Sequence, residues 1–302
     1  MVTPVYRSLA YLPAFIDETL AAVRAVGAEA SWELVFVIDG SPDESLAYLI
    51  ERKREVPQIV ILEFSRNFGH HPAILAGLTA ARGERVFLID NDLEVRPAVM
   101  VDFWQRMGET AVDVVYAYQA ERAGGAVRKR TGGLFYALIN SLSDTRVPPN
   151  ILTERLMTHS YVRALASVGD YNLFLGGLMY WVGFRQLGVP VEKTVKKTST
   201  YSLLRRVQLA LNAITSFSSR PLTFMFQVGA VISSVSFGYG LYLVLRKLVM
   251  GPGVSLGYTS LATLVLFSTG LIITSLGTIG IYLGKVYQQT QARPRYIVKE
   301  WH

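Results

Sequence analysis

Residues 85–92 read RVFLIDND, a short apolar run that ends in two aspartates separated by one asparagine. The run predicts a buried strand over residues 85–89, so that Asp90 and Asp92 follow at its carboxyl end. Two carboxylates at that spacing can share one divalent cation, and Mg²⁺ and Mn²⁺ suit such oxygen ligands. A solvated turn would have the same short motif, so its meaning depends on the sequence around it.

The sequence on either side alternates apolar runs with helical patterns. Strands are expected at 2–6, 32–38, 58–64, 85–89 and 112–118, and helices at 12–26, 44–54, 71–82 and 97–107. Strands separated by helices of this length predict βαβ units, and therefore an α/β fold with a Rossmann-like, mostly parallel sheet. Such sheets bind ligands beyond the carboxyl ends of their strands, where Asp39 and Asp90 are both expected.

Two other expected strand ends carry polar motifs. Asp39 begins a DGSPD turn, where an acidic group could hydrogen-bond a base edge or a ribose hydroxyl; an ordinary turn that caps the next helix fits equally well. Residues 65–70, SRNFGH, follow the third strand, and Arg66 could pair with a diphosphate. His70 and His71 are interpreted as surface or capping residues, because no other histidine is near them in the sequence.

The composition divides the chain into two unlike parts. Its 302 residues have a formal charge of +7, no cysteine and 51% hydrophobic residues, with most of the charge in the first two hundred. Disulfides, thiolate metal sites and cysteine nucleophiles are therefore excluded. The positive charge fits an anionic membrane surface or phosphorylated ligands, and no nucleic-acid partner is expected because no nucleic-acid motif is present.

Two long uncharged spans lie in the last third of the chain. Residues 222–245 and about 258–284 are each long enough to cross roughly 30 Å of hydrocarbon. Basic residues concentrate before the first span and after the second, whereas the loop between them has only Arg246 and Lys247. This bias predicts that both termini lie in the cytoplasm. Two buried helices of a soluble protein are the alternative.

Six segments, taken in order, resemble one family of enzymes. They are IDGSPD (38–43), SRNFGHHPAILAGL (65–78), the Asp-x-Asp with LEVRP (93–97), FYALIN (135–140), GLMYWVGFRQLGV (177–189) and FSSRPL (217–222). The ordered set, which covers nearly the whole chain, is similar to the polyprenyl-phosphate glycosyltransferases of glycosyltransferase family 2. That group includes relatives of dolichyl-phosphate mannose synthase and bacterial bactoprenyl glucosyl transferases.

The resemblance implies a GT-A catalytic domain and an inverting hexosyl transfer that uses Mg²⁺ or Mn²⁺. The donor would be a nucleotide-sugar, with a UDP-sugar favoured, and the acceptor a polyprenyl (undecaprenyl) phosphate in the bacterial inner membrane. The expected parts are a cytoplasmic GT-A domain (1–200), an interfacial amphipathic helix (201–220), a two-helix transmembrane module (221–288) and a cytoplasmic basic tail (289–302). Self-association through the interfacial and transmembrane helices is also expected.

The resemblance also assigns roles to residues of this sequence. The donor-binding residues would be Pro4, Val5, Tyr6, Asp39, Arg66 and Asp90, and the metal ligands Asp90 and Asp92. The face turned to the acceptor and the membrane would include Arg122, Arg128, Phe135, Tyr136, Trp181, Phe184, Lys197 and Tyr201. The catalytic group would comprise Asp92, Thr153, Glu154 and Arg155.

One departure from the family bears on mechanism. Thr153 stands where the family has an aspartate, two residues before the arginine that corresponds to Arg155. A phosphate acceptor is already largely ionised and needs little help from a base, so this replacement could be harmless. Alternatively, Glu154 takes over the role, or the acceptor is a lipid-linked saccharide whose hydroxyl must be activated.

Two other classes of function remain to be weighed. A catalytically degenerate relative could serve as a scaffold subunit of an envelope-assembly complex, although retention of Asp39, Asp90 and Asp92 favours an active enzyme. A transporter or flippase subunit ranks last, because two spans without an ionisable residue make a poor transport path.

Overall fold

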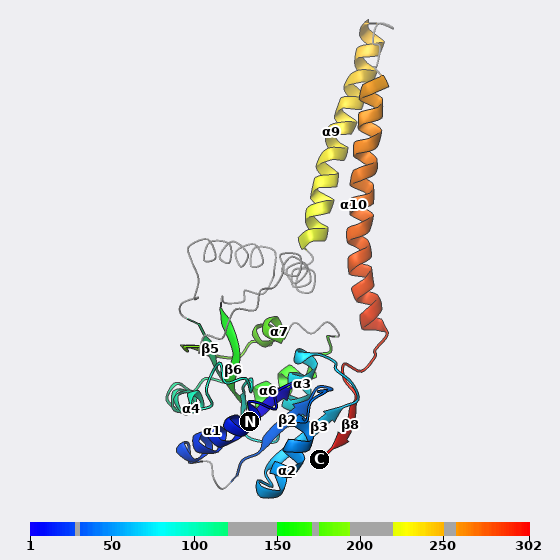
Figure 1. Ribbon diagram of the computed structural model, residues 1–302. Helices are drawn as coiled ribbons and strands as arrows, with labels where there is room; N and C mark the ends of the chain where they lie inside the picture. The colour runs from blue at the N-terminus through cyan, green and yellow to red at the C-terminus, as the bar shows by residue number, and fades with distance from the viewer. Residues whose placement is uncertain (28–30, 120–149, 171–174, 194–219, 251–257) are drawn as a thin grey trace.

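The computed structural model (Figure 1) describes residues 1–27, 31–119, 150–170, 175–193, 220–250 and 258–302. The elements are β1 (Val2–Val5), α1 (Leu12–Ala25), β2 (Leu34–Ile38), α2 (Ser45–Glu55), β3 (Ile59–Phe64), α3 (His70–Ala80), β4 (Arg85–Leu88), α4 (Val99–Thr110), β5 (Val114–Tyr118), β6 (Ile151–Thr158), α6 (His159–Ser167), α7 (Leu175–Trp181), β7 (Gln186–Pro190), α9 (Arg220–Met250), α10 (Tyr258–Thr290) and β8 (Val298–Trp301). The interfacial helix predicted at 201–220 lies, except for its last residue, outside the described residues.

The strands form one eight-stranded sheet in the order β7-β5-β6-β4-β1-β2-β3-β8. β1 is parallel to β2 and β4, β2 is parallel to β3, and β5 is parallel to β7. β6 runs antiparallel to β4 and β5, and β8 runs antiparallel to β3. The predicted α/β class with a mostly parallel sheet is confirmed, and the antiparallel strands come from segments whose pattern predicted no strand.

Helices cover both faces of this sheet. On one face Phe15 of α1, Leu49 of α2 and Phe103 of α4 belong to a single buried apolar cluster. On the other face Ile74 of α3 and Leu178 of α7 belong to a second cluster. Because each central strand is buried on both sides, its sequence reads as a nearly continuous apolar run. The sheet is therefore rigidly packed, and its carboxyl edge can hold loops in fixed positions.

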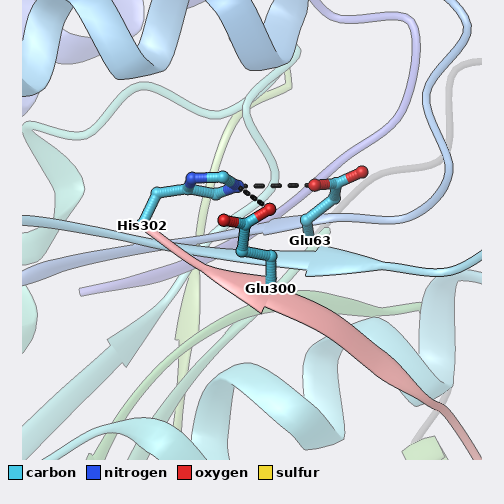
Figure 2. Close-up of side chains that lie close together, drawn as sticks. All are labelled: Glu63, Glu300 and His302. Atoms are coloured by element: carbon cyan, nitrogen blue, oxygen red, sulfur yellow. Dashed lines mark hydrogen bonds and ion pairs between the residues drawn. The ribbon is translucent and has the colours of Figure 1, made fainter.

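The end of the chain returns to this sheet. β8 pairs with β3 in a register that sets Trp301 opposite Leu62 and Glu300 opposite Glu63. Figure 2 shows Glu300 and His302 beside Glu63 across this pair of strands. Residues 289–302, predicted as a basic tail, thus include the strand that covers one edge of the sheet. Covering that edge protects the backbone groups of β3 from pairing with other chains.

Two long helices, α9 and α10, extend side by side away from the α/β domain (Figure 1). They contain 31 and 33 residues, and each is long and apolar enough to cross a membrane. Their large apolar side chains are exposed, with Phe226 at 75% and Phe237 at 76% of full accessibility. Apolar surface of this extent is unfavourable in water and requires an apolar environment or a partner.

Candidate active site

Loops at the carboxyl edge of the sheet surround a pocket of about 410 Å³. Its lining residues are Pro4, Val5, Tyr6, Arg7, Ser8, Tyr11, Asp39, Asn67, Gly69, His70, Asp90, Asn91 and Asp92. A larger cavity, of about 570 Å³, lies at the opposite edge beside Trp32, Arg85 and Trp104. We assign the site to the smaller pocket, because it has the Asp-x-Asp pair and lies where α/β sheets bind ligands.

The pocket gathers most of the residues expected to contact the donor. Pro4, Val5 and Tyr6 follow one another at the end of β1, and Asp39 lies at the end of the neighbouring strand β2. Arg66 is not part of the lining. Its guanidinium carbon lies 4.3 Å from the centroid of the Phe68 ring on the exposed side of the loop.

The residues of the Asp-x-Asp turn are held individually. The side-chain amide of Asn91 donates to the carbonyl of Pro4 at 2.8 Å, which ties the turn to the end of β1. Asp92 Oδ1 accepts the backbone N–H of Glu94 at 2.9 Å, and Leu93 between them has a positive φ of 58°. A left-handed backbone is uncommon for a leucine, so this turn has a defined and constrained shape.

Asp90 has a histidine neighbour that the sequence pattern did not indicate. His70 Nε2 lies 3.5 Å from Asp90 Oδ1 in the pocket, while its side chain is 48% exposed at the start of α3, a position compatible with the predicted surface or capping role. Burial raises the pKa of Asp90, and Asp92 adds to the rise. His70 and a hydrogen bond from Thr153 oppose it, and the net direction is upward. A cation near Asp90 would therefore favour its ionised form.

Asp39 has a structural function that can be read directly. Its buried carboxylate accepts the backbone N–H of Phe68 at 2.6 Å and that of Gly69 at 2.9 Å. Gly40 approaches the backbone at Arg66 and Asn67 so closely, and with a φ of +58°, that a side chain there would overlap it. Asp39 and Gly40 thus fix the 65–70 loop, which in turn positions His70.

A second set of hydrogen bonds holds the loop after β1. Ser41 Oγ accepts the N–H of Arg7 at 2.7 Å, and Asp43 Oδ2 accepts the N–H of Leu9 at 3.2 Å. Burial would raise the pKa of Asp43, but hydrogen bonds from Ser41, Ser45 and Leu9 outweigh it and lower the pKa. The DGSPD turn therefore shapes the pocket wall that contains Tyr6.

β6 brings the predicted catalytic segment up to the aspartates. The β4–β6 register sets Leu88 opposite Arg155, and continuing it places Asp90 opposite Thr153. Glu154 is 2% exposed, and its Oε2 accepts no hydrogen bond from the described residues. Burial, with the nearby charges of Asp90 and Asp92, raises the pKa of Glu154 to about 7.

Arg155 differs from its neighbours in orientation. Its guanidinium is buried, donates to the carbonyls of Thr153 at 3.2 Å and Leu152 at 3.1 Å, and interacts with Tyr161. Like Thr153 and Glu154, it is not among the residues that line the pocket. These contacts indicate a role in supporting β6, while Thr153 and Glu154 are the members of this segment that approach the aspartates.

Lys193 is a positively charged neighbour of the acidic cluster formed by Asp90, Asp92, Glu94 and Glu154. Its Nζ lies 2.8 Å from Glu94 Oε2, and each side chain is 30% exposed. Burial would lower the pKa of Lys193, but Glu94, with smaller effects from Glu154 and Asp92, raises it. Its ion-pair partner Glu94 is 99 positions away in the chain, so no local pattern indicated this contact.

The residues expected on the acceptor and membrane face are only partly described. Trp181 at the end of α7 is 62% exposed and Phe184 is 45% exposed, with the Phe184 ring edge-on to Tyr161 at 5.4 Å. Both therefore present aromatic surface to the outside of the domain. The others lie outside the described residues: Arg122, Arg128, Phe135, Tyr136, Lys197 and Tyr201.

A second group of possible cation ligands lies at the β3–β8 edge. The ligand atoms of Glu63, Glu300 and His302 lie within 4.8 Å of one another (Figure 2). However, Lys299 Nζ is 2.6 Å from Glu63 Oε1. Burial would raise the pKa of Glu63, but Lys299 and His302 lower it. These side chains already compensate the charge of Glu63, so the arrangement is that of an ion-paired sheet edge.

An α/β sheet with an Asp-x-Asp turn and a polar pocket at its carboxyl edge defines a GT-A glycosyltransferase. Residues 1–165 match the family model described as glycosyl transferase family 2. The chain belongs to this family and is a glycosyltransferase.

Relatives align over almost the whole chain. A bactoprenol glucosyl transferase of Shigella phage SfX is 33% identical over 306 residues, which cover 99% of this chain and 98% of that protein. A prophage bactoprenol glucosyl transferase homolog of Escherichia coli K12 is 32% identical over 306 residues, covering 99% and 97%. Among solved structures, TarS of Staphylococcus aureus with UDP-GlcNAc has a TM-score of 0.48 and 15% identity over 71% of this chain and 64% of that one. The structural likeness is too low to bear on ligands.

Proposed function

We propose that this glycosyltransferase moves a sugar, with inversion, from a nucleotide-sugar to a polyprenyl phosphate at the cytoplasmic face of a bacterial plasma membrane, for envelope glycan assembly. A UDP-sugar is the favoured donor. The observation that carries the proposal is the pocket in which the Asp-x-Asp turn, His70 and the β1 loop meet. The exposed apolar helices and the relatives named bactoprenol glucosyl transferases support a lipid acceptor.

The donor's nucleoside would lie against the β1 loop. Tyr6 is 46% exposed and offers an aromatic face for a base, while the backbone hydrogen bonds that the loop donates to Ser41 and Asp43 keep it in place. Asp39 can still accept a hydrogen bond from a ribose or base, because each carboxylate oxygen has two lone pairs and the backbone bonds use one each.

The residues of the turn fit a divalent cation. Asp90 Oδ1 is buried and accepts no hydrogen bond from the described part of the chain, and Asp92 lies two residues away. These hard oxygen ligands would hold Mg²⁺ or Mn²⁺. When bound, such an ion neutralises negative charge on a departing nucleoside diphosphate. A buried carboxylate oxygen that accepts no hydrogen bond and has a histidine at 3.5 Å would be stabilised by such a partner.

His70 and the amino end of helix α3 would both lie near the diphosphate of the donor. His70 is the first residue of the 11-residue helix α3, whose amino end has a partial positive charge. Its imidazole faces Asp90 across 3.5 Å. We propose that His70 donates to the donor diphosphate and orients Asp90, which makes it a site residue that the sequence pattern missed.

A phosphate acceptor suits the chemistry of the acceptor side. Thr153 has no basic group, but a phosphate monoester has a second pKa of roughly 6 and arrives at neutral pH largely ionised. Proton removal is then unnecessary, and positioning the nucleophile is enough. Glu154 is buried and interacts electrostatically with Asp90 and Asp92. It would influence the charge state of these two aspartates and would take no part in the reaction of the acceptor.

A lipid-linked saccharide acceptor is the second candidate, and one observation favours it. Attack by a sugar hydroxyl needs a general base, and a base works best when its pKa is near the working pH. The pKa of Glu154, raised to about 7, meets that condition. Glu154→Gln therefore distinguishes the two acceptors. With a hydroxyl acceptor the kcat of this variant should be at least a hundredfold below that of wild type, whereas with a phosphate acceptor it should be close to that of wild type.

The topology of the sheet supports the proposed membrane arrangement. β1 at the beginning of the chain and β8 at its end belong to the same sheet, so the chain leaves the domain through α9 and returns through α10. A helical hairpin that crosses the bilayer twice has both ends on one side, which agrees with the predicted cytoplasmic termini.

The direct test is sugar transfer by purified protein. We expect transfer from a radiolabelled UDP-sugar to undecaprenyl phosphate with Mn²⁺, and a loss of at least a hundredfold in kcat/KM for Asp92→Ala. The matched control is Asp102→Ala, which removes an exposed carboxylate of α4 that is paired with Arg106. Equal rates in wild type and Asp92→Ala would refute the metal site, and an inactive wild type with every nucleotide-sugar and lipid phosphate would refute the proposed function.

A further inference from the structure

The segment that follows α10 contacts the loop that positions His70. We call residues 65–70 the donor loop, and the tail is residues 289–302, as above. The N–H of Ser65, the first residue of the donor loop, donates to the carbonyl of Ile297 in the tail at 3.1 Å. The neighbouring Tyr296 ring stacks on Phe64, the last residue of β3, with centroids 5.1 Å apart and planes inclined by 9°.

The aromatic contacts continue into the donor loop. Phe64 is buried and meets the ring of Phe68 edge-on, with 5.7 Å between centroids. The N–H of Phe68 donates to Asp39, and the next N–H, that of Gly69, donates to the same carboxylate. Three rings in succession, from Tyr296 to Phe68, therefore connect the tail to the hydrogen bonds that shape the donor loop.

The tail is itself held at several points. Before the stack, Gln289 donates to the carbonyl of Gly169 at 2.9 Å, and Arg295 donates to the carbonyl of Val168. After it, Lys299 pairs with Glu63. These bonds join the end of α10 to the loop after α6 and to β3. Tyr296 thus lies between fixed points and can act as a support for the rings beside it.

The donor loop needs such a support because its own structure is irregular. Gly69 has a φ of +103°, and residues 65–69 belong to no helix or strand. A loop that must be ordered when its ligand binds lowers the affinity by the cost of that ordering. A ring that holds the loop in its bound shape removes part of this cost.

We propose that Tyr296 is a positioning residue for the nucleotide-sugar site, and that through it the tail after the second apolar helix sets donor affinity. The inference rests on the proposed function, because it assigns the donor to this pocket. It extends that function by giving the end of the chain a part in the site. Tyr296 does not line the pocket and acts only through Phe64 and Phe68.

The test compares variants of the full-length protein. Tyr296→Ala removes the stack, Tyr296→Phe keeps the ring, and Ile297→Ala is the matched control, since Ile297 is 50% exposed and offers Ser65 only its backbone carbonyl. Because an aromatic pair contributes modestly, we expect Tyr296→Ala to raise the donor KM and Kd roughly three- to tenfold, with kcat nearly unchanged. Tyr296→Phe and Ile297→Ala should match wild type.

Hydrogen exchange gives a readout that needs no donor. In Tyr296→Ala the N–H groups of Phe68 and Gly69 should exchange faster, while protection in α1 stays constant. If Tyr296→Ala is unstable, Tyr296→Leu, which keeps apolar volume without a ring, should show the same faster exchange and weaker donor binding. Unchanged exchange and donor Kd in these variants would overturn the inference. If wild type itself binds no nucleotide-sugar, the proposed function fails instead, whatever the exchange data show.

Discussion

His70 Nε2 and Asp90 Oδ1 face each other across 3.5 Å in the pocket, although twenty positions separate the two residues in the sequence. The contact depends on the donor loop, which Asp39 holds by two backbone hydrogen bonds. The buried carboxylate of Asp39 thereby places His70 beside the carboxylate of Asp90. A hydrogen-bond donor and a hard oxygen ligand then meet where a diphosphate would bind.

Removal of the imidazole should affect the donor side of the reaction. Hydrogen bonds to charged groups contribute roughly 1.5–3 kcal/mol, so we expect His70→Ala to lower kcat/KM for the nucleotide-sugar about ten- to a hundredfold. His70→Gln, which keeps a donor near Asp90, should recover part of this loss. Steady-state kinetics at saturating acceptor measure both. Wild-type kinetics in His70→Ala would show that the contact with Asp90 has no part in donor use.

Asp39 should matter for the fold of the site as well as for its ligand. Asp39→Ala leaves the N–H groups of Phe68 and Gly69 without their acceptor, and each unpaired buried group costs roughly 1–3 kcal/mol. We expect a lower free energy of unfolding and no measurable donor binding. Asp43→Ala, at the end of the same turn, should leave these two N–H groups protected from hydrogen exchange. If they stay equally protected in Asp39→Ala, the assigned hydrogen bonds are wrong.

The sequence predicted the parallel half of the sheet because its strands are buried on both faces. β2 consists of LVFVI, an apolar run without a polar break. The strands that escaped prediction have no such run. β6 includes Thr153, Glu154 and Arg155, and β8 consists of VKEW at an edge where charged side chains meet water. Their pairing is set by partners far away in the chain, which no local pattern reports.

The same reason explains which site residues were found. Asp90 and Asp92 can be recognised in the sequence because they directly follow an apolar strand. His70 and Lys193 have no such local mark, and each becomes meaningful only through a carboxylate brought near by the fold. Asp39 was predicted to bind the donor and lines the pocket, but its bonds to the donor loop depend on how β2 and β3 lie together.

Glu154 should make the stability of the metal-free protein depend on pH. Its pKa is raised from 4.5 to about 7, so between these values the unfolded chain has lost the proton that the folded chain still binds. Stability therefore falls as pH rises through this window, by on the order of 3 kcal/mol if the group acts alone. Glu154→Gln cannot ionise, and its melting temperature in a chelator should exceed that of wild type at pH 8 but match it near pH 4.

The control for this titration is Glu300→Gln, which changes an exposed carboxylate of the edge strand β8. It should keep the pH dependence of wild type. A constant difference in melting temperature between wild type and Glu154→Gln from pH 4 to pH 8 would mean that the glutamate has an ordinary pKa in the folded state. A chelator is needed because a cation bound to Asp90 and Asp92 would favour the ionised form of Glu154.

Lys193 should weaken cation binding at the acidic cluster. Its ammonium group lies near Asp92 and Glu154 as well as against Glu94. The positive charge of this group would repel a divalent cation bound at Asp90 and Asp92. Because the side chain is 30% exposed, solvent screens the effect, and we expect Lys193→Gln to tighten Mn²⁺ binding only about two- to fivefold at pH 8. Titration calorimetry at low and high salt measures this change, which should shrink as salt rises.

Lys299→Gln, which removes a lysine paired with Glu63 at the far edge, should bind Mn²⁺ as wild type does. Weaker binding in Lys193→Gln would instead mean that the lysine holds Glu94 and its neighbours in the geometry that the cation requires.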